Sequence, residues 1–126
     1  MNLKNGEIQI NGELFSSGYT FEVFKKSEFY DNQDGIRIIN LNGIHCIGNN
    51  NFVVSLFFRN YVLYMISMIC IDVNISFEDE LKRKQLHDDI LKKYGVESPA
   101  IFDWGNIKSV YDPKGNVSSI NIVYNI

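Results

Sequence analysis

The sequence predicts an α+β fold, in which a mostly antiparallel, twisted sheet of about six to eight strands packs against one long helix. Short apolar or alternating runs recur along the chain, and turn-forming pairs such as Asn11-Gly12 separate them. One segment, about residues 76–94, has the length and the capping residues of a helix of several turns. A chain of 126 residues suits one core, so we expect a single domain over 1–126.

The first quarter of the chain is predicted to form a hairpin and a short helix. Asn11-Gly12 lies between two short alternating runs, and both residues tolerate the positive φ of a tight turn. Thr20 can cap a helix over about residues 20–27, because its hydroxyl oxygen can accept an unpaired backbone N–H. The polar residues 31–35 then predict a turn.

Two short strands are predicted next, over residues 36–39 and 44–47. Asn42-Gly43 lies between them and predicts a tight turn, so we expect these strands to pair with each other as a second hairpin. Residues 48–51 are polar and predict a loop.

Two strongly apolar runs, residues 52–58 and 61–73, are predicted to form the centre of the sheet. Arg59-Asn60 separates them and is expected to reverse the chain. Both faces of the second run are apolar, which is typical of a strand covered at least in part on both sides. A buried helix remains the alternative, because periodicity alone does not distinguish the two.

The C-terminal part is predicted to contain the long helix and a closing hairpin. Ser76 is a suitable N-cap and Gly95 a suitable C-terminal stop. Pro and Gly within residues 112–115 predict the turn between strands 106–111 and 118–124. The apolar side of the helix is expected to comprise Phe77, Leu81, Ile90, Leu91 and Tyr94.

Composition argues against several classes of protein. The net charge is −3 and the basic residues are scattered, which argues against a nucleic-acid binder, since such proteins carry a basic stripe. The N-terminus lacks an apolar signal core, and no apolar run reaches the roughly 20 residues of a membrane span. We therefore expect a cytoplasmic protein without membrane contact. Cys46 and Cys70 lie in apolar runs and predict two buried thiols.

No standard catalytic or cofactor motif is present: GxxxxGK, GxGxxG, HExxH and GxSxG are all absent. We expect no cofactor and no metal. His45 and Cys46 are neighbours in a strand and should face opposite sides. His87 is expected to be a partly buried, hydrogen-bonded helix residue. The alternative is a small enzyme in which His87 works with Cys70 or a carboxylate.

Two groups of acidic residues are candidates for a binding surface. Glu78, Asp79, Glu80, Asp88 and Asp89 flank the long helix, and Asp31 and Asp34 lie in the polar turn. A solvated surface explains the helix acids without any function. Catalytic carboxylates would need a cleft, whereas a protein-docking surface needs only exposure. Trp104, together with Tyr61 and other tyrosines, is either an aromatic plug at the edge of the sheet or an interface residue.

Three segments carry a resemblance to a known class: FSSGYTFEVF (residues 15–24), WGNIKSVYDPKG (104–115) and SINIVY (119–124). They resemble small bacterial proteins of the toxin-immunity type, which are encoded beside contact-dependent or polymorphic toxins. The resemblance implies a non-catalytic cytoplasmic inhibitor, a monomer or small homo-oligomer, that binds and neutralises a cognate toxin domain. An acidic surface would suit a basic nuclease toxin, so the seven acids above are the expected contacts.

Two other functions remain open. The chain could be a small-ligand or envelope-associated binding module, with the curved sheet forming a pocket. It could also be the small enzyme that uses His87.

Overall fold

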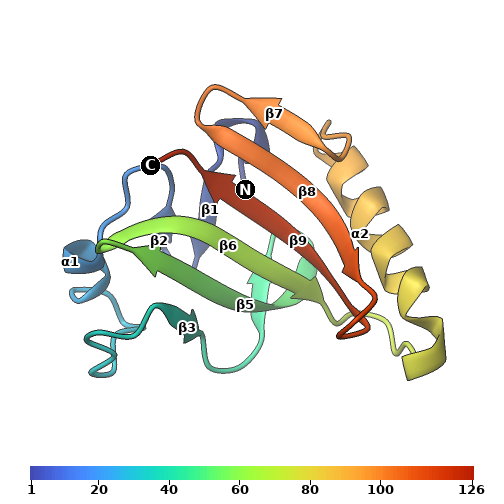
Figure 1. Ribbon diagram of the computed structural model, residues 1–126, viewed down its shortest axis with the longest axis horizontal. Coiled ribbons are helices and arrows are strands. Elements are labelled where there is room, and N and C mark those ends of the chain that lie inside the picture. The colour runs from blue at the N-terminus through green and yellow to red at the C-terminus, as the bar shows by residue number, and fades with distance from the viewer.

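The computed structural model describes residues 1–126 and confirms the α+β class (Figure 1). Its main feature is a seven-stranded sheet in which every neighbouring pair is antiparallel. The strands follow the order β3-β5-β6-β9-β8-β7, and β4 also pairs with β5. Their bounds are β3 Ile38–Asn40, β4 His45–Ile47, β5 Asn50–Arg59, β6 Val62–Cys70, β7 Ala100–Phe102, β8 Gly105–Asp112 and β9 Val117–Tyr124.

The predicted hairpin around Asn42-Gly43 is wrong. β3 and β4 do not pair with each other; both pair with β5, one after the other along the same edge. Residues 41–44 lie opposite only residues 53–54, so Asn42-Gly43 belongs to a bulge in an interrupted edge strand. The tight turn is Gly48-Asn49, which joins β4 to β5 where a loop was expected. β5 has ten residues and is long enough to hold both short strands.

The central hairpin is confirmed, with its turn displaced by one residue. Arg59 pairs with Val62, and the turn residues Asn60 and Tyr61 have φ of 51° and 64°. Two consecutive positive φ values match the right-handed twist of the adjoining strands, although a bulky residue such as tyrosine rarely adopts this conformation. The second apolar run is a strand and not a helix, and it ends at Cys70.

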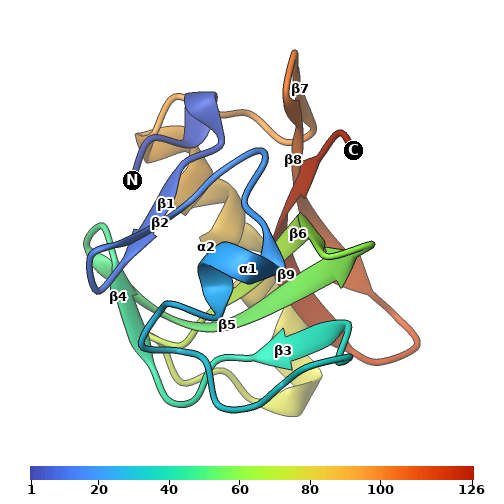
Figure 2. The same ribbon diagram turned by 90° about the vertical axis from the view of Figure 1, so that its left-hand side faces the viewer.

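All other elements cover one face of the sheet, and the opposite face is open (Figure 2). The covering elements are η1 Leu3–Asn5, the hairpin of β1 Ile8–Ile10 and β2 Glu13–Phe15, α1 Phe21–Phe24, and η2 Phe77–Asp79 leading into α2 Glu80–Lys93. Alternate residues of β5, among them Phe52 and Leu56, are buried beneath them in one continuous core. The intervening residues of β6 are half-buried on the open face.

The caps explain where the helices begin and end. The Thr20 hydroxyl accepts the Val23 N–H at 3.3 Å, as expected, but α1 has only four residues instead of the predicted 20–27. At the end of α2 the N–H groups of Val96 and Gly95 donate to the carbonyls of Leu91 and Lys92, both at 3.0 Å. This paired pattern, with φ of 75° at Gly95, confirms the predicted helix stop.

The start of the long helix differs from the prediction. Phe77 and Leu81 were expected on the apolar side, but they are 75% and 63% exposed, and the buried residues of α2 are His87, Ile90 and Leu91. The helix begins beside the β8–β9 turn, where Asn116 Nδ2 donates to the Phe77 carbonyl at 2.7 Å. Its first turn therefore lies beyond the core. Neither helix combines the length and apolar character needed to cross a lipid bilayer.

Candidate functional site

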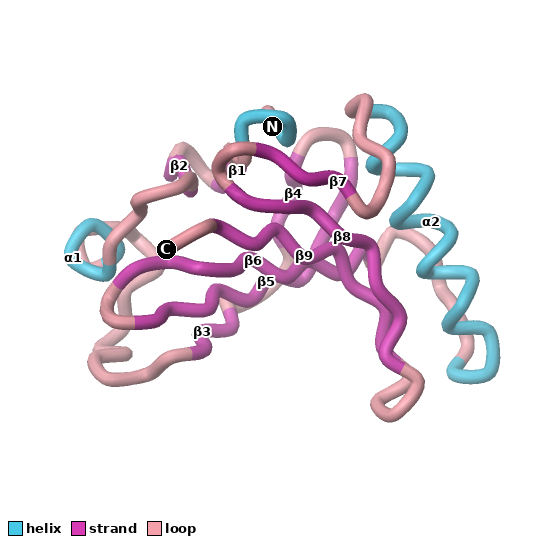
Figure 3. The backbone as a smooth tube through the Cα atoms, turned by 45° about the horizontal axis from the view of Figure 1, so that its top comes forward, coloured by secondary structure: helices cyan, strands magenta, loops and turns pink.

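The seven candidate acids do not form one surface. Five lie on η2 and α2, whereas Asp31 and Asp34 lie beside α1, at the opposite end of the molecule (Figure 1, Figure 3). Asp34 is placed there by the Tyr30 hydroxyl, which donates to it at 2.6 Å, and by Lys25 at 3.8 Å. A partner that contacted all seven would have to span the long axis, so the two groups are separate candidate sites.

Glu80 is engaged within the fold. Its side chain is 12% exposed, it pairs with Arg83 at 3.2 Å, and it accepts the Ser118 N–H at 3.0 Å. The Arg83 guanidinium also donates to the Cys70 carbonyl. Glu80 thus ties α2 to β9, and a partner could reach it only by disrupting that contact.

The other helix acids also have partners, with one exception. Asp88 accepts from Lys84 at 2.9 Å; partial burial opposes the charge, yet the hydrogen bond from this ammonium leaves the pKa of Asp88 below its ordinary value. Asp79 lies 3.6 Å from Lys82, and Asp89 accepts from Gln85 at 3.0 Å. Glu78 alone forms no side-chain contact of this kind. Because three of these five carboxylates are paired with Lys or Arg, the helix should attract a basic partner less strongly than its acidic sequence indicates.

His87 is hydrogen-bonded, as predicted, but it is fully buried where partial burial was expected. Its Nε2 accepts the Cys70 backbone N–H at 3.0 Å, and burial, together with nearby Arg83, lowers its pKa to about 4. The Cys70 thiol is also buried, which raises its pKa. A nucleophile needs an accessible thiolate and a free base, and this pair offers neither. The geometry is that of a structural contact between β6 and α2.

His45 and Cys46 face opposite sides of β4, as the strand alternation predicted. Cys46 is exposed, so the prediction of two buried thiols holds only for Cys70. His45 is 7% exposed, and its ring meets Phe29 edge-on at 5.8 Å. Its Nε2 is buried without a hydrogen-bond partner. Such orphaned atoms are uncommon in folded proteins and direct attention to the hollow beside this histidine.

Trp104 is half-buried and packs against the core as an aromatic plug. Its indole N–H donates to the Lys4 carbonyl at 2.8 Å, and its ring stacks on Phe102 at 5.2 Å. A Cβ at Gly6 would lie 2.8 Å from the same ring, so the ring closely covers this turn. Tyr61 differs, because its side chain is 72% exposed.

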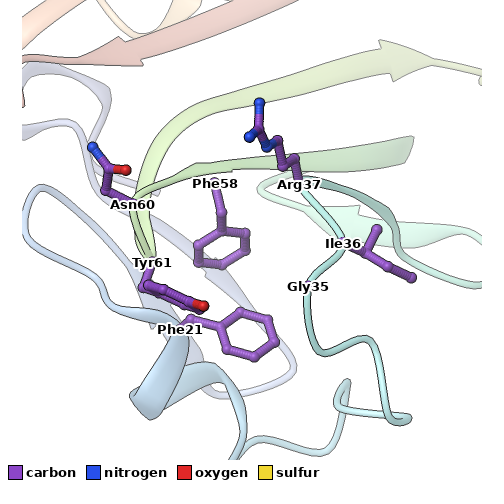
Figure 4. Close-up of a pocket in the computed structure, with 7 residues that line it drawn as sticks. All are labelled: Phe21, Gly35, Ile36, Arg37, Phe58, Asn60 and Tyr61. Carbon is purple, nitrogen blue, oxygen red and sulfur yellow. The ribbon is translucent and has the colours of Figure 1, made fainter.

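A small hollow of about 310 Å³ lies between α1, the segment that enters β3, and the β5–β6 turn. Figure 4 shows the rings of Phe21, Phe58 and Tyr61 gathered on one side of it and Ile36 on the other, with the Arg37 guanidinium directed away from the rings. Phe21 packs edge-on against Phe58 at 5.4 Å, and its N–H donates to the Tyr61 carbonyl at 2.8 Å. The rim is therefore aromatic, with one cation and no carboxylate.

A second hollow of about 710 Å³ adjoins the first, and Ile36 lines both. Its charged lining residues are Glu28 and Asp31, and neither Lys nor Arg contributes to it. Carboxamides from several positions and the His45 ring complete the polar part of the wall. We call the two hollows, together with the neighbouring Asp34, the α1-end surface, defined by Phe21, Glu28, Asp31, Asp34, Ile36, Arg37, Ile38, His45 and Tyr61.

Sequence reasoning identified part of this surface. Asp31, Asp34 and Tyr61 were candidates, whereas Ile36 and Arg37 were predicted to begin a strand and so were missed. The only sequence signal for them was their position directly after the polar 31–35 turn.

No protein family, no curated protein and no solved structure matches this chain.

Proposed function

We propose that the chain is an immunity-type binding protein that neutralises a cognate toxin domain by covering it with the α1-end surface. The supporting observation is the coincidence of exposed apolar side chains with free carboxylates. Tyr61 and Ile36 are 72% and 51% exposed, and Asp31, which lines one hollow together with Ile36, has no ion-pair partner. Interfaces derive most of their binding energy from a few aromatic and arginine residues within a polar rim.

An inhibitor that acts by steric coverage needs no nucleophile, no metal and no cofactor. Carboxylates at the rim would speed encounter with a basic toxin domain, and buried aromatic contacts would slow its dissociation. We propose that the chain acts in the cytoplasm as a monomer or small homo-oligomer, since its target would have to be met where the toxin acts.

The direct test is binding to the C-terminal domain of a large exported protein encoded beside this chain, measured by biolayer interferometry. Tyr61→Asn removes the ring but suits the positive φ of this turn, so the fold should be unaffected. We expect it to weaken binding at least tenfold, or about 1.4 kcal/mol. Leu81→Asn, at the exposed start of α2, is the matched control and should bind like the wild type.

Two outcomes would contradict the proposal. If the wild-type chain does not bind the toxin domain, the immunity function is wrong. If it binds and Leu81→Asn weakens the complex while Tyr61→Asn does not, the α2 end is the interface.

A small-ligand binding module is the second candidate, and the hollow beside His45 favours it. A volume of about 710 Å³ lies within the range of about 300–1,000 Å³ that ligand pockets occupy. Native mass spectrometry of the freshly purified chain would reveal a retained ligand as added mass. A His45→Phe variant that loses this mass while remaining folded would support the module.

A further inference from the structure

β3 presents an unpaired backbone edge to the α1-end surface. The Phe58 N–H donates to the Arg37 carbonyl at 2.7 Å, and the Leu41 N–H donates to the Val54 carbonyl at 3.0 Å. In an antiparallel ladder the residues between such pairs direct their N–H and C=O groups away from the partner strand. Ile38 and Asn40 are these residues, and β5 is the only neighbour of β3. Their four backbone groups are therefore available to another strand.

The two hollows lie along this edge and carry opposite charge. Ile36 and Arg37 line the aromatic hollow, and residues 38–42 line the acidic one. An extended chain beside β3 would thus meet a cation at one hollow and the carboxylates of Glu28 and Asp31 at the other. Neither carboxylate is held by an ion pair within the fold.

We propose that an extended segment of the toxin domain adds a strand to the β3 edge, with a lysine or arginine side chain in the acidic hollow and an apolar side chain in the aromatic one. This inference rests on the proposed function and specifies its binding mode. Main-chain hydrogen bonds to Ile38 and Asn40 give affinity, and the two hollows give sequence selectivity.

The rest of the edge explains why the added strand is confined to β3. The bulge at residues 41–44 interrupts the ladder, so pairing cannot continue into β4 in the same register. The other outer strand, β7, is equally short, but neither of these hollows borders it. Of these two outer strands, only β3 combines unpaired backbone groups with two adjacent hollows of opposite charge.

The test compares two substitutions at one position. Asn40→Pro and Asn40→Ala both remove the hydrogen bond in which Ser55 Oγ donates to Asn40 Oδ1, but only proline also removes the outward N–H. Proline is tolerated in an edge strand where its N–H would face away from the sheet. We expect Asn40→Pro to bind the toxin domain at least tenfold more weakly than Asn40→Ala, with both variants folded by circular dichroism.

Amide hydrogen exchange of the wild-type chain, followed by NMR, provides a second readout that needs no variant. Addition of the toxin domain should slow exchange at Ile38 and Asn40, with little change at Ile39 and Leu41, which are already paired. If the wild type binds but these two amides are not protected, or if the proline and alanine variants bind equally, strand addition is wrong while the immunity function stands. Absence of wild-type binding would instead reject the proposed function itself.

Discussion

The Cys70 backbone N–H donates a hydrogen bond to Nε2 of His87 across 3.0 Å, and this contact links the central strand β6 to the long helix α2. Because Nε2 must accept, the imidazole is neutral in the folded protein. Burial is the main reason that the pKa of His87 falls from 6.5 to about 4. The contact therefore connects the stability of the fold to pH.

The sign of this dependence follows from proton binding. Between pH 6.5 and about 4 the unfolded chain binds a proton at His87 that the folded chain does not, so acid favours unfolding. The contribution of His87 is complete above the unfolded pKa and is lost as the pH falls toward 4. We expect urea unfolding to show about 2 kcal/mol lower stability at about pH 5 than at about pH 7.5 from this group.

His87→Gln isolates that contribution. The Gln carbonyl can still accept the Cys70 N–H, but it does not titrate, so the variant should lose less stability over the same pH interval than the wild type. Equal pH dependence in the two proteins would show that His87 is not the group responsible.

Glu80 and Glu78 are both acidic residues at the start of the long helix, but only Glu80 contacts the rest of the fold through its side chain. Glu80→Ala leaves the Ser118 N–H and the Nε–H of Arg83 without their acceptor, so we expect a loss of about 2–3 kcal/mol in the free energy of unfolding. Glu78→Ala removes an exposed carboxylate with no contact, and should change stability by less than about 0.5 kcal/mol. Equilibrium urea unfolding of both variants checks this. Similar values for the two would contradict the structural role of Glu80.

Gly105 is required by the packing of β8 against β9. A Cβ at this position would lie 1.9 Å from the Val123 carbonyl oxygen, and a backbone atom cannot move aside as a side chain can. We expect Gly105→Ala to cost at least about 3 kcal/mol, measured by thermal unfolding. Gly115→Ala, in the turn of the same hairpin, meets only side chains, the nearest being Asp112 at 3.3 Å, and is the control. A stable, wild-type-like Gly105→Ala variant would show that β8 and β9 pack differently.

Elements with strong local signals could be predicted from the sequence. The central and closing hairpins follow from apolar runs separated by short polar turns, and the end of α2 follows from Gly95. Each of these signals acts within a few residues, where backbone preferences decide the structure. The overall α+β class followed from their order.

The remaining features depend on contacts distant in sequence. Asn42-Gly43 is a good hairpin turn locally, but the long edge of β5 pairs with both flanking segments and converts it into a bulge. Phe77 has the spacing of a core residue, yet the helix docks farther along its length. The α1-end surface brings Ile36, Arg37 and Tyr61 together from separate elements, which no local pattern encodes.

The most direct measurement of the central claim is hydrogen–deuterium exchange mass spectrometry of the full chain, alone and with the toxin domain bound. Binding at the α1-end surface should slow exchange in peptides that cover residues 28–41 and 58–62 and leave residues 77–89 unchanged. Protection confined to residues 77–89 would place the partner on the long helix and contradict the account.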